Sequence, residues 1–218
     1  AARPAIVATL AARSGRPLLV VTSTFREAED FVAALGSWIG SDEIAYYPAW
    51  ETLPHERLSP RSDTVGRRLA VLRRITGRGE QPPPRVVVAP VRAVLQPQVR
   101  GLAELAPVTI ERGVEYDITQ LATDLVNAAY HRVDLVERRG EFAVRGGIVD
   151  VFPPTEEHPV RVDFFGDEVD EIRTFTVSDQ RSTPHVLERV VASPCRELLL
   201  DATVRARAAT LLAAHPEL

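Results

Sequence analysis

The chain has 218 residues, 45% of them apolar, and a net charge of −4, which is typical of a soluble globular protein. No apolar run approaches the roughly 18 residues that a membrane span needs, so we expect no membrane association. A module that bound DNA mainly through phosphates would usually be basic, and this one is acidic. The single cysteine, Cys195, excludes an internal disulfide and fits a cytoplasmic location.

All 26 basic residues are arginine, and no methionine is present. A phosphate-binding loop whose lysine reaches the β- and γ-phosphates therefore cannot be encoded here. The missing methionine indicates a piece of a longer protein. Arginine is well suited to paired hydrogen bonds with carboxylates, so the composition favours a protein partner over nucleotide or nucleic acid.

The first hundred residues alternate predicted helices with predicted strands. The strand at 18–21 is a continuous apolar run, which is typical of a strand buried on both faces. Thr24 is a candidate N-cap for the next helix, with Glu27 as the capping-box acid. The apolar stripe of that helix comprises Phe31, Val32, Leu35 and Trp38. Further strands are expected at 44–47 and 85–90, and further helices at 5–12, 66–75 and 92–95.

The remaining chain changes character near residue 106. A strand at 107–111 and a helix at 117–129, with Asp117 as its N-cap, come first. Short alternating segments separated by glycine and proline then predict an antiparallel, curled sheet. These strands are expected at 133–137, 141–144, 147–152, 160–165 and 169–175. From about Val191 the chain is expected to turn helical again, which suggests that the β-rich part is an insertion.

The segment 47–61 follows a strand of the parallel sheet, at the edge where such sheets bind ligands. Tyr47, Trp50 and His55 there would suit an aromatic platform for a nucleic-acid base. We favour simple packing of the loop onto the sheet, because no phosphate-binding glycines accompany the aromatic residues. A stripe of arginines on the following helix offers a DNA-binding alternative, but a solvated outer face is the favoured interpretation. That stripe comprises Arg67, Arg68, Arg73, Arg74 and Arg78.

Strand alternation places Arg161 and Phe165 on the same face of the strand at 160–165. Arg145 precedes a glycine pair, Gly146 and Gly147, which permits a bulge or tight bend. Two arginines and an aromatic ring on one exposed surface resemble a protein-binding hot spot. The alternative is that Arg161 pairs with Asp163 or a cross-strand acid while Phe165 fills a core, and the pattern alone leaves both open.

Catalytic patterns are missing from the sequence. The acids between residues 163 and 171 crowd a Gly-Asp turn and do not match a calcium loop. The histidines are scattered, the serines lack a GxSxG setting, and Cys195 is expected to be a small buried apolar residue. We therefore expect no catalytic, cofactor-binding or metal-binding residue in this chain.

Two segments carry a family resemblance: EFAVRGGIVDVFP at 141–153, and VRVDFFGDEVDEIR at 160–173 with SDQR at 178–181. They resemble the module shared by the bacterial transcription-repair coupling factors, the Mfd family, and the UvrB family of excision-repair helicases. The residues WETLP at 50–54 and RRL at 67–69 resemble the coupling factors more closely. The resemblance extends over nearly the whole chain.

The resemblance implies an α/β fold: a degenerate helicase-like parallel-sheet domain in two segments, with an inserted α+β domain rich in antiparallel strands. The first segment would be residues 1–106, the insertion 107–190 and the return segment 191–218. UvrB has a working phosphate loop where this chain has residues 22–26, and the coupling factors have lost it. The alternative function is a nucleotide- or DNA-binding lobe of a UvrB-like helicase.

The resemblance also implies partners. The inserted domain would bind UvrA, the damage-recognition ATPase, through Arg145, Arg161 and Phe165, and so recruit it to lesion-stalled RNA polymerase. Other domains of the parent chain would be further partners and would mask this surface if they docked on it. RNA polymerase, DNA, ATP and magnesium would be bound by parts of the parent that lie outside this chain.

Overall fold

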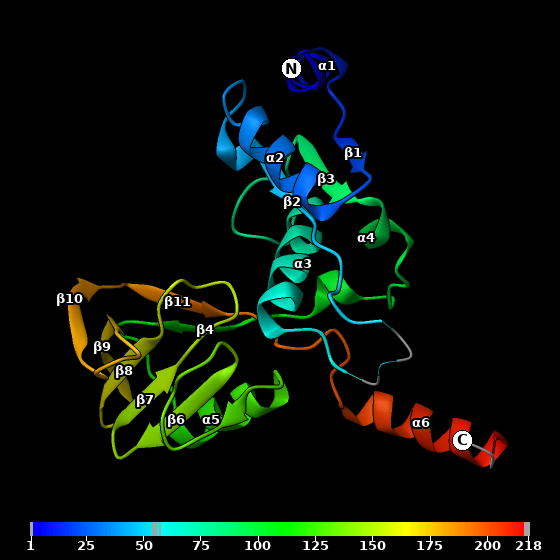
Figure 1. Cartoon of the computed structure of the whole chain (residues 1–218). Helices are drawn as coiled ribbons and strands as arrows, with labels where there is room; N and C mark the ends of the chain where they lie inside the picture. The colour runs from blue at the N-terminus through cyan, green and yellow to red at the C-terminus, as the bar shows by residue number, and fades with distance from the viewer. Residues whose placement is uncertain (1, 54–55, 57, 216–218) are drawn as a thin grey trace. The chain divides into compact units, whose positions relative to one another are not determined.

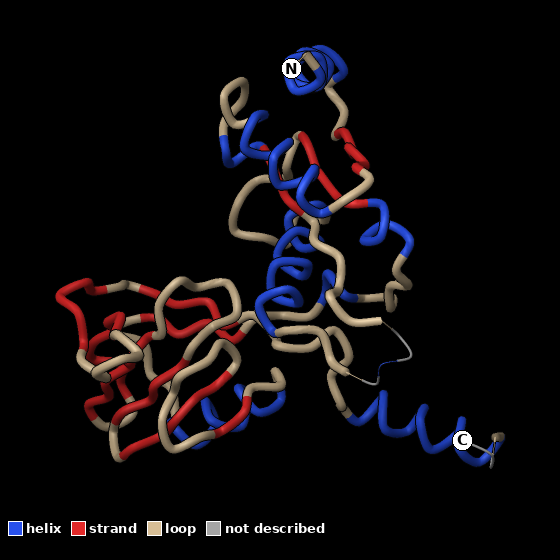
Figure 2. The backbone as a smooth tube through the Cα atoms, in the orientation of Figure 1, coloured by secondary structure: helices blue, strands red, loops and turns tan. Residues whose placement is uncertain are grey.

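The computed structural model describes residues 2–53, 56 and 58–215 (Figure 1). The chain forms two compact units, Ala1–Ala106 and Pro107–Leu218. The first contains most of the helices and a parallel sheet, and the second contains most of the strands (Figure 2). The fold therefore mixes parallel and antiparallel sheets with helices, as expected.

The first unit is built on a three-stranded parallel sheet in the order β1-β3-β2. Strand β3 (Val86–Pro90) is central and buried along its whole length, with β1 (Leu18–Thr22) and β2 (Ile44–Tyr46) on either side. A strand buried on both faces reads as a continuous apolar run, as β3 does. The run in β1 was misinterpreted: β1 lies at the sheet edge, with Leu19 56% and Val21 48% exposed.

Helices cover both faces of this sheet. Helices α1 (Arg3–Ser14) and α2 (Phe25–Leu35) pack with Val86 and Val88 on one face. Helices α3 (Ser62–Ile75) and α4 (Val91–Leu95) pack with the alternate β3 residues on the other. The short 3₁₀ turns η1 (Ser41–Glu43) and η3 (Leu102–Glu104) also belong to this unit.

The N-cap predicted for α2 is confirmed. The Thr24 hydroxyl accepts the Glu27 backbone N–H at 3.1 Å. The Glu27 carboxylate turns back and accepts the Ser23 N–H at 3.1 Å and the Ser23 hydroxyl at 2.7 Å. The predicted stripe ends earlier than expected, because α2 stops at Leu35 and Trp38 beyond it is 61% exposed.

The second unit contains a six-stranded sheet in the order β10-β9-β8-β7-β6-β5. Its strands are β5 (His131–Arg132), β6 (Glu141–Arg145), β7 (Ile148–Val151), β8 (Val160–Phe165), β9 (Glu168–Phe175) and β10 (Ser182–Val186). All pairs are antiparallel except β5 with β6. The strand predicted at 133–137 is wrong: that segment is a loop, and the strand before it is only two residues long.

A two-stranded ribbon, β4 (Val108–Glu111) with β11 (Arg189–Ala192), and helix α5 (Ile118–Asn127) close the core of this unit. Leu121 and Leu125 of α5 are fully buried against the sheet. The Asp117 carboxylate caps α5 by accepting the Gln120 N–H at 2.7 Å, as predicted.

The prediction that the chain becomes helical from about Val191 is wrong, because Val191 lies in β11 and pairs with Thr109. The chain stays with this core as far as Cys195, whose N–H donates to the Ala128 carbonyl at 2.9 Å. Helix α6 (Ala202–Ala214) follows, capped by Asp201. Within the part of the chain that the structure describes, no helix has the length and apolar character to cross a membrane.

Candidate protein-interaction surface

The six-stranded sheet has one face packed on the core and one face turned away from it. Val149, Val151, Val160, Val162 and Ile172 point into the core with α5. The residues that alternate with them form the opposite face, which we call the outer face. It includes Arg145, Ile148, Asp150, Arg161, Asp163, Phe165, Glu171 and Arg173. Ala143 and Phe175 alternate onto the same side but are buried there in a second apolar cluster with Val136 and Phe152, so part of this face is covered.

A two-residue turn places Arg145 at the end of this face. Arg145 pairs with Ile148 across the β6–β7 hairpin, with Gly146 and Gly147 between them. Gly146 has φ +59°, which favours glycine, and a Cβ on Gly147 would lie 3.3 Å from the Phe164 carbonyl oxygen. The glycine pair therefore forms a tight turn and not a bulge.

The bulge lies instead in β9. Asp163 is opposite Glu171, but the next residue, Phe164, is opposite Val169, so Asp170 is an extra residue. Because the extra residue is on β9, the alternation of β8 continues unbroken. Phe164 packs against the core and Phe165 stays on the outer face, where it is 82% exposed. The alternative in which Phe165 fills a core is therefore wrong.

Both predicted arginines bind one buried carboxylate. Asp150 is directly opposite Arg161 in the β7–β8 pairing, and its side chain is 0% exposed. Arg161 donates from Nε to Oδ1 at 2.7 Å and from Nη2 to Oδ2 at 2.9 Å, a two-pronged pairing. Arg145 donates from Nη2 to the same Oδ2. The structure thus brings Arg145 and Arg161 together through Asp150, which confirms the cross-strand acid that the alternative gave as the partner of Arg161.

The two guanidiniums differ in their access to solvent. The Arg161 side chain is 16% exposed and that of Arg145 is 46% exposed. Arg161 also donates from Nη1 to the Gln180 carbonyl at 3.2 Å, and its guanidinium carbon lies 5.0 Å from the centroid of the Phe175 ring. The hydrogen bonds to Asp150 raise the pKa of Arg161. The expectation that both arginines are free to meet a partner is therefore wrong for Arg161.

Acidic residues lie beside the exposed ring. Asp163 and Glu171 are directly opposite each other on the outer face, and like charges in that position destabilise a sheet. Glu171 pairs with Arg173, and this hydrogen bond raises the pKa of Arg173. Partial burial raises the pKa of Asp163, against the opposing effect of Arg161 and Arg173.

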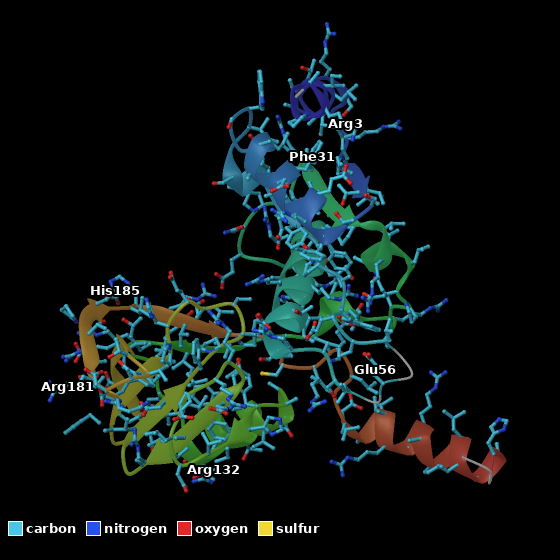
Figure 3. All side chains as sticks on the ribbon, in the orientation of Figure 1. Arg3, Phe31, Glu56, Arg132, Arg181 and His185 are labelled. Atoms are coloured by element: carbon cyan, nitrogen blue, oxygen red, sulfur yellow. The ribbon has the colours of Figure 1, made fainter. Side chains whose placement is uncertain are left out.

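One further arginine borders this region. Arg132 of β5 and Arg145 of β6 line a hollow of about 510 Å³ together with Val133, Asp134 and Val144. Strand β5, which carries Arg132, and β10, which Arg181 precedes, are the two edge strands of the sheet, and both side chains are labelled in Figure 3. Sequence analysis missed Arg132, because the strand was expected to begin one residue after it.

A second hollow lies in the first unit, at the carboxyl ends of the parallel strands. It has a volume of about 740 Å³, and its lining includes Phe25, Tyr46, Trp50, Arg61, Arg67 and Arg92. In nucleotide-binding proteins the helix N-terminus at this edge offers its N–H groups to phosphate. Here the Glu27 carboxylate already accepts the Ser23 N–H, and these hydrogen bonds from Ser23 lower the pKa of Glu27. Between β1 and α2 the chain therefore has the Glu27 carboxylate bound to the Ser23 N–H, where a phosphate site would have a free N–H donor.

The aromatic residues of 47–61 pack around an arginine. Arg68 is 0% exposed, its guanidinium carbon lies 4.4 Å from the Tyr47 ring centroid and 5.1 Å from that of Trp50, and its Nη1 donates to the Pro48 carbonyl at 2.9 Å. Packing is therefore the role of Tyr47 and Trp50, as favoured, while His55 lies outside the described residues.

The prediction that the arginines of α3 form a solvated outer face is wrong for Arg68, and partly wrong for Arg73 and Arg74. Arg73 donates to the Leu105 carbonyl at 3.0 Å, and Arg74 donates to the Pro82 carbonyl at 3.2 Å. Three of the five arginines thus hold their own unit together, which leaves less of the stripe for DNA phosphates.

The described residues contain no group of three or more His, Cys, Asp and Glu side chains that could hold a metal ion. Cys195 is 5% exposed in the core of the second unit, and burial raises its thiol pKa to about 12. A thiol with so high a pKa is a poor nucleophile, so the expected role as a small buried residue is confirmed.

Residues 108–197 match the family model described as the UvrB interaction domain. The matched range spans β4 to β11 and so includes the whole six-stranded sheet and its outer face. The class of protein that this defines is one carrying a UvrB-type interaction domain.

Comparison with known proteins gives the family. The chain is 54% identical over 215 residues to the transcription-repair-coupling factor of Mycobacterium tuberculosis, covering 97% of this chain. It is 34% identical over 209 residues to that of Bacillus subtilis and 31% identical over 205 residues to that of Escherichia coli, covering 95% and 92% of this chain. The chain thus belongs to the family of the transcription-repair-coupling factors, and it spans 17% of the length of each of these relatives.

Proposed function

We propose that this chain is a non-catalytic protein-binding module of a transcription-repair coupling factor, and that it recruits UvrA to lesion-stalled RNA polymerase. The observation that carries the proposal is the outer face of the sheet within the matched UvrB interaction domain. There Phe165 of β8 is 82% exposed, and Arg145 of β6, two strands away on the same face, is half-exposed. An exposed aromatic ring and an exposed guanidinium on one face are typical of a protein-binding surface.

The first unit has a supporting role in this proposal. Its helix-covered parallel sheet is a degenerate helicase-like domain, and the β-rich part is an insertion in its chain; the return segment then begins after Cys195 and not at Val191, because Val191 lies in β11. The Ser23–Glu27 corner keeps the strand-to-helix connection, while the Glu27 carboxylate accepts the Ser23 N–H and the Thr24 hydroxyl accepts the Glu27 N–H. ATP, magnesium, RNA polymerase and DNA are then left to other domains of the parent, whose docking would mask the outer face.

The chemistry of the outer face defines what UvrA must supply. The Phe165 ring needs an apolar pocket, because its exposed apolar surface stabilises a complex only when the complex removes it from water. Arg145 needs a carboxylate on UvrA, to which a guanidinium can make paired hydrogen bonds. Arg161 contributes less directly, since its nitrogens are already bound within the module.

The test is comigration of the purified chain with UvrA in size-exclusion chromatography. We expect the wild-type chain to comigrate and Phe165→Ala to lose most of the complex. Val126→Ala is the matched control, because Val126 is 53% exposed on α5, the helix that packs on the core side of the sheet. A complex that forms equally well with Phe165→Ala would refute the assignment of this face.

A further inference from the structure

Asp150 is an unusual residue to find on a face that meets another protein. Its carboxylate is fully buried, and it accepts hydrogen bonds from the two arginines that the proposed function singles out. A buried carboxylate is stable only when it is paired, so Asp150 requires these guanidiniums. Conversely, the position of Asp150 determines where the two guanidiniums lie.

The two arginines use Asp150 in different ways. Arg161 is bound through Nε, Nη1 and Nη2 and is largely covered, so little of its guanidinium remains for a partner. Arg145 uses Nη2 alone, is about half exposed, and stands at the end of the hairpin next to the hollow shared with Arg132. One arginine is therefore directed inward and the other outward, with the same carboxylate between them.

We propose that Asp150 is a positioning residue for partner binding: it holds the Arg145 guanidinium in place on the outer face, while Arg161 acts by anchoring Asp150. This inference rests on the proposed function, and it assigns separate roles to the residues of that site. A guanidinium that is already held in place loses less side-chain freedom when it pairs with a carboxylate of the partner. Removing Asp150 would leave Arg145 exposed and charged but free to move.

A double-mutant cycle tests this, because residues that act through one another give non-additive effects. Binding of UvrA to the chain is measured by titration calorimetry for wild type, Arg145→Ala, Asp150→Asn and the double variant. We expect Arg145→Ala to weaken binding by about 30-fold and Asp150→Asn by about 10-fold. In the Arg145→Ala background, Asp150→Asn should cost less than about twofold, since the residue it positions is gone.

Phe165 supplies the control cycle. Its ring is on the same strand as Arg161 but four residues away, and it is not part of the Asp150 cluster. Asp150→Asn combined with Phe165→Ala should therefore multiply the two single losses. A merely structural effect of Asp150→Asn would be equally large in the Arg145→Ala and Phe165→Ala backgrounds, which distinguishes damage to the fold from loss of positioning.

Thermal unfolding of each variant establishes that it is folded. If Asp150→Asn does not fold, Arg161→Lys replaces it in both cycles, because lysine keeps the charge beside Asp150 but cannot form the two-pronged pairing. Losses that multiply in the Arg145→Ala background would overturn the positioning role while leaving the proposed function intact. Absence of binding by the wild-type chain itself would remove the proposed function as well.

Discussion

Arg161 and Phe165 lie four residues apart on the same face of β8, yet they have opposite relations to solvent. The Arg161 side chain is 16% exposed because its guanidinium donates hydrogen bonds to Asp150 on the neighbouring strand. Phe165 is 82% exposed because β8 continues beyond the acid cluster to the turn at Gly166. A charged residue is thus covered and an aromatic one uncovered, which is the reverse of what their hydropathy favours.

This inversion has a physical explanation in the partner that we propose. An exposed phenylalanine contributes nothing to the stability of the free chain, whereas in a complex its burial would contribute about 2 kcal/mol. The outer face therefore resembles a protein-binding surface more than the solvent-exposed side of a sheet.

Arg68 is expected to stabilise the first unit. Arg68→Ala would remove the guanidinium held by Tyr47, Trp50 and the Pro48 carbonyl, and should lower the free energy of unfolding by about 3 kcal/mol. Arg67→Ala, at the exposed neighbouring position, should change it by less than about 0.5 kcal/mol. Urea unfolding of both variants measures the difference, and equal effects would show that the burial of Arg68 is unimportant.

Asp163 should destabilise the second unit slightly at neutral pH. Because its pKa is raised in the folded chain, its favourable contribution is present below the unfolded pKa and lost as the pH rises through the folded value. Asp163→Asn is therefore expected to raise stability at pH 7 by about 0.5 kcal/mol, and to have no effect once the acid is protonated. Thermal unfolding from pH 7 down to about pH 3 follows this, and a variant less stable than wild type at pH 7 would contradict it.

Cys195 should be unreactive in the folded chain. Burial raises its thiol pKa to about 12, so the thiolate is scarce at pH 8. A thiol reagent at pH 8 should leave the native chain unmodified for hours and modify one thiol promptly in denaturant. The raised pKa also predicts a stability that is intact below about pH 8.5 and falls as the pH rises above it. Rapid labelling of the native chain would show that the core around Ala128 opens readily.

ATP should not bind to the first unit. The N–H of Ser23 is bound by Glu27, the N–H of Glu27 is bound by Thr24, and the chain has no lysine to contact phosphate. Calorimetric titration with ATP and magnesium is expected to give only heats of dilution. A saturable signal that Glu27→Gln strengthens would restore the alternative of a nucleotide-binding lobe.

Much of the fold follows from local patterns in the sequence. The caps at Thr24 and Asp117, and the apolar alternation of β8, depend on neighbouring residues and so could be predicted. The position of β1 at a sheet edge and the burial of Arg68 depend on residues distant in the sequence. An apolar run reads the same in a central strand and an edge strand, and an arginine on a helix shows no sign of the aromatic pair that covers it.

The placement of the three candidate residues on one face of the sheet was predictable, but the hydrogen bonds that connect them were not. Period-two alternation places Arg161 and Phe165 together, and the glycine turn places Arg145 near them. That Asp150 accepts hydrogen bonds from both arginines depends on the pairing register of β7 with β8, which alternation alone leaves undetermined. Arg132 was missed for a similar reason, since its strand is too short to leave a periodic pattern.

Hydrogen exchange of the chain with and without UvrA tests the central claim most directly, because it locates the contact without a substitution. The account predicts slower exchange at the two turns that border the outer face, Gly146–Gly147 and Gly166–Asp167, with little change in α5 on the core side of the sheet. Unchanged exchange at both turns, with protection confined to α5 or to the first unit, would contradict it.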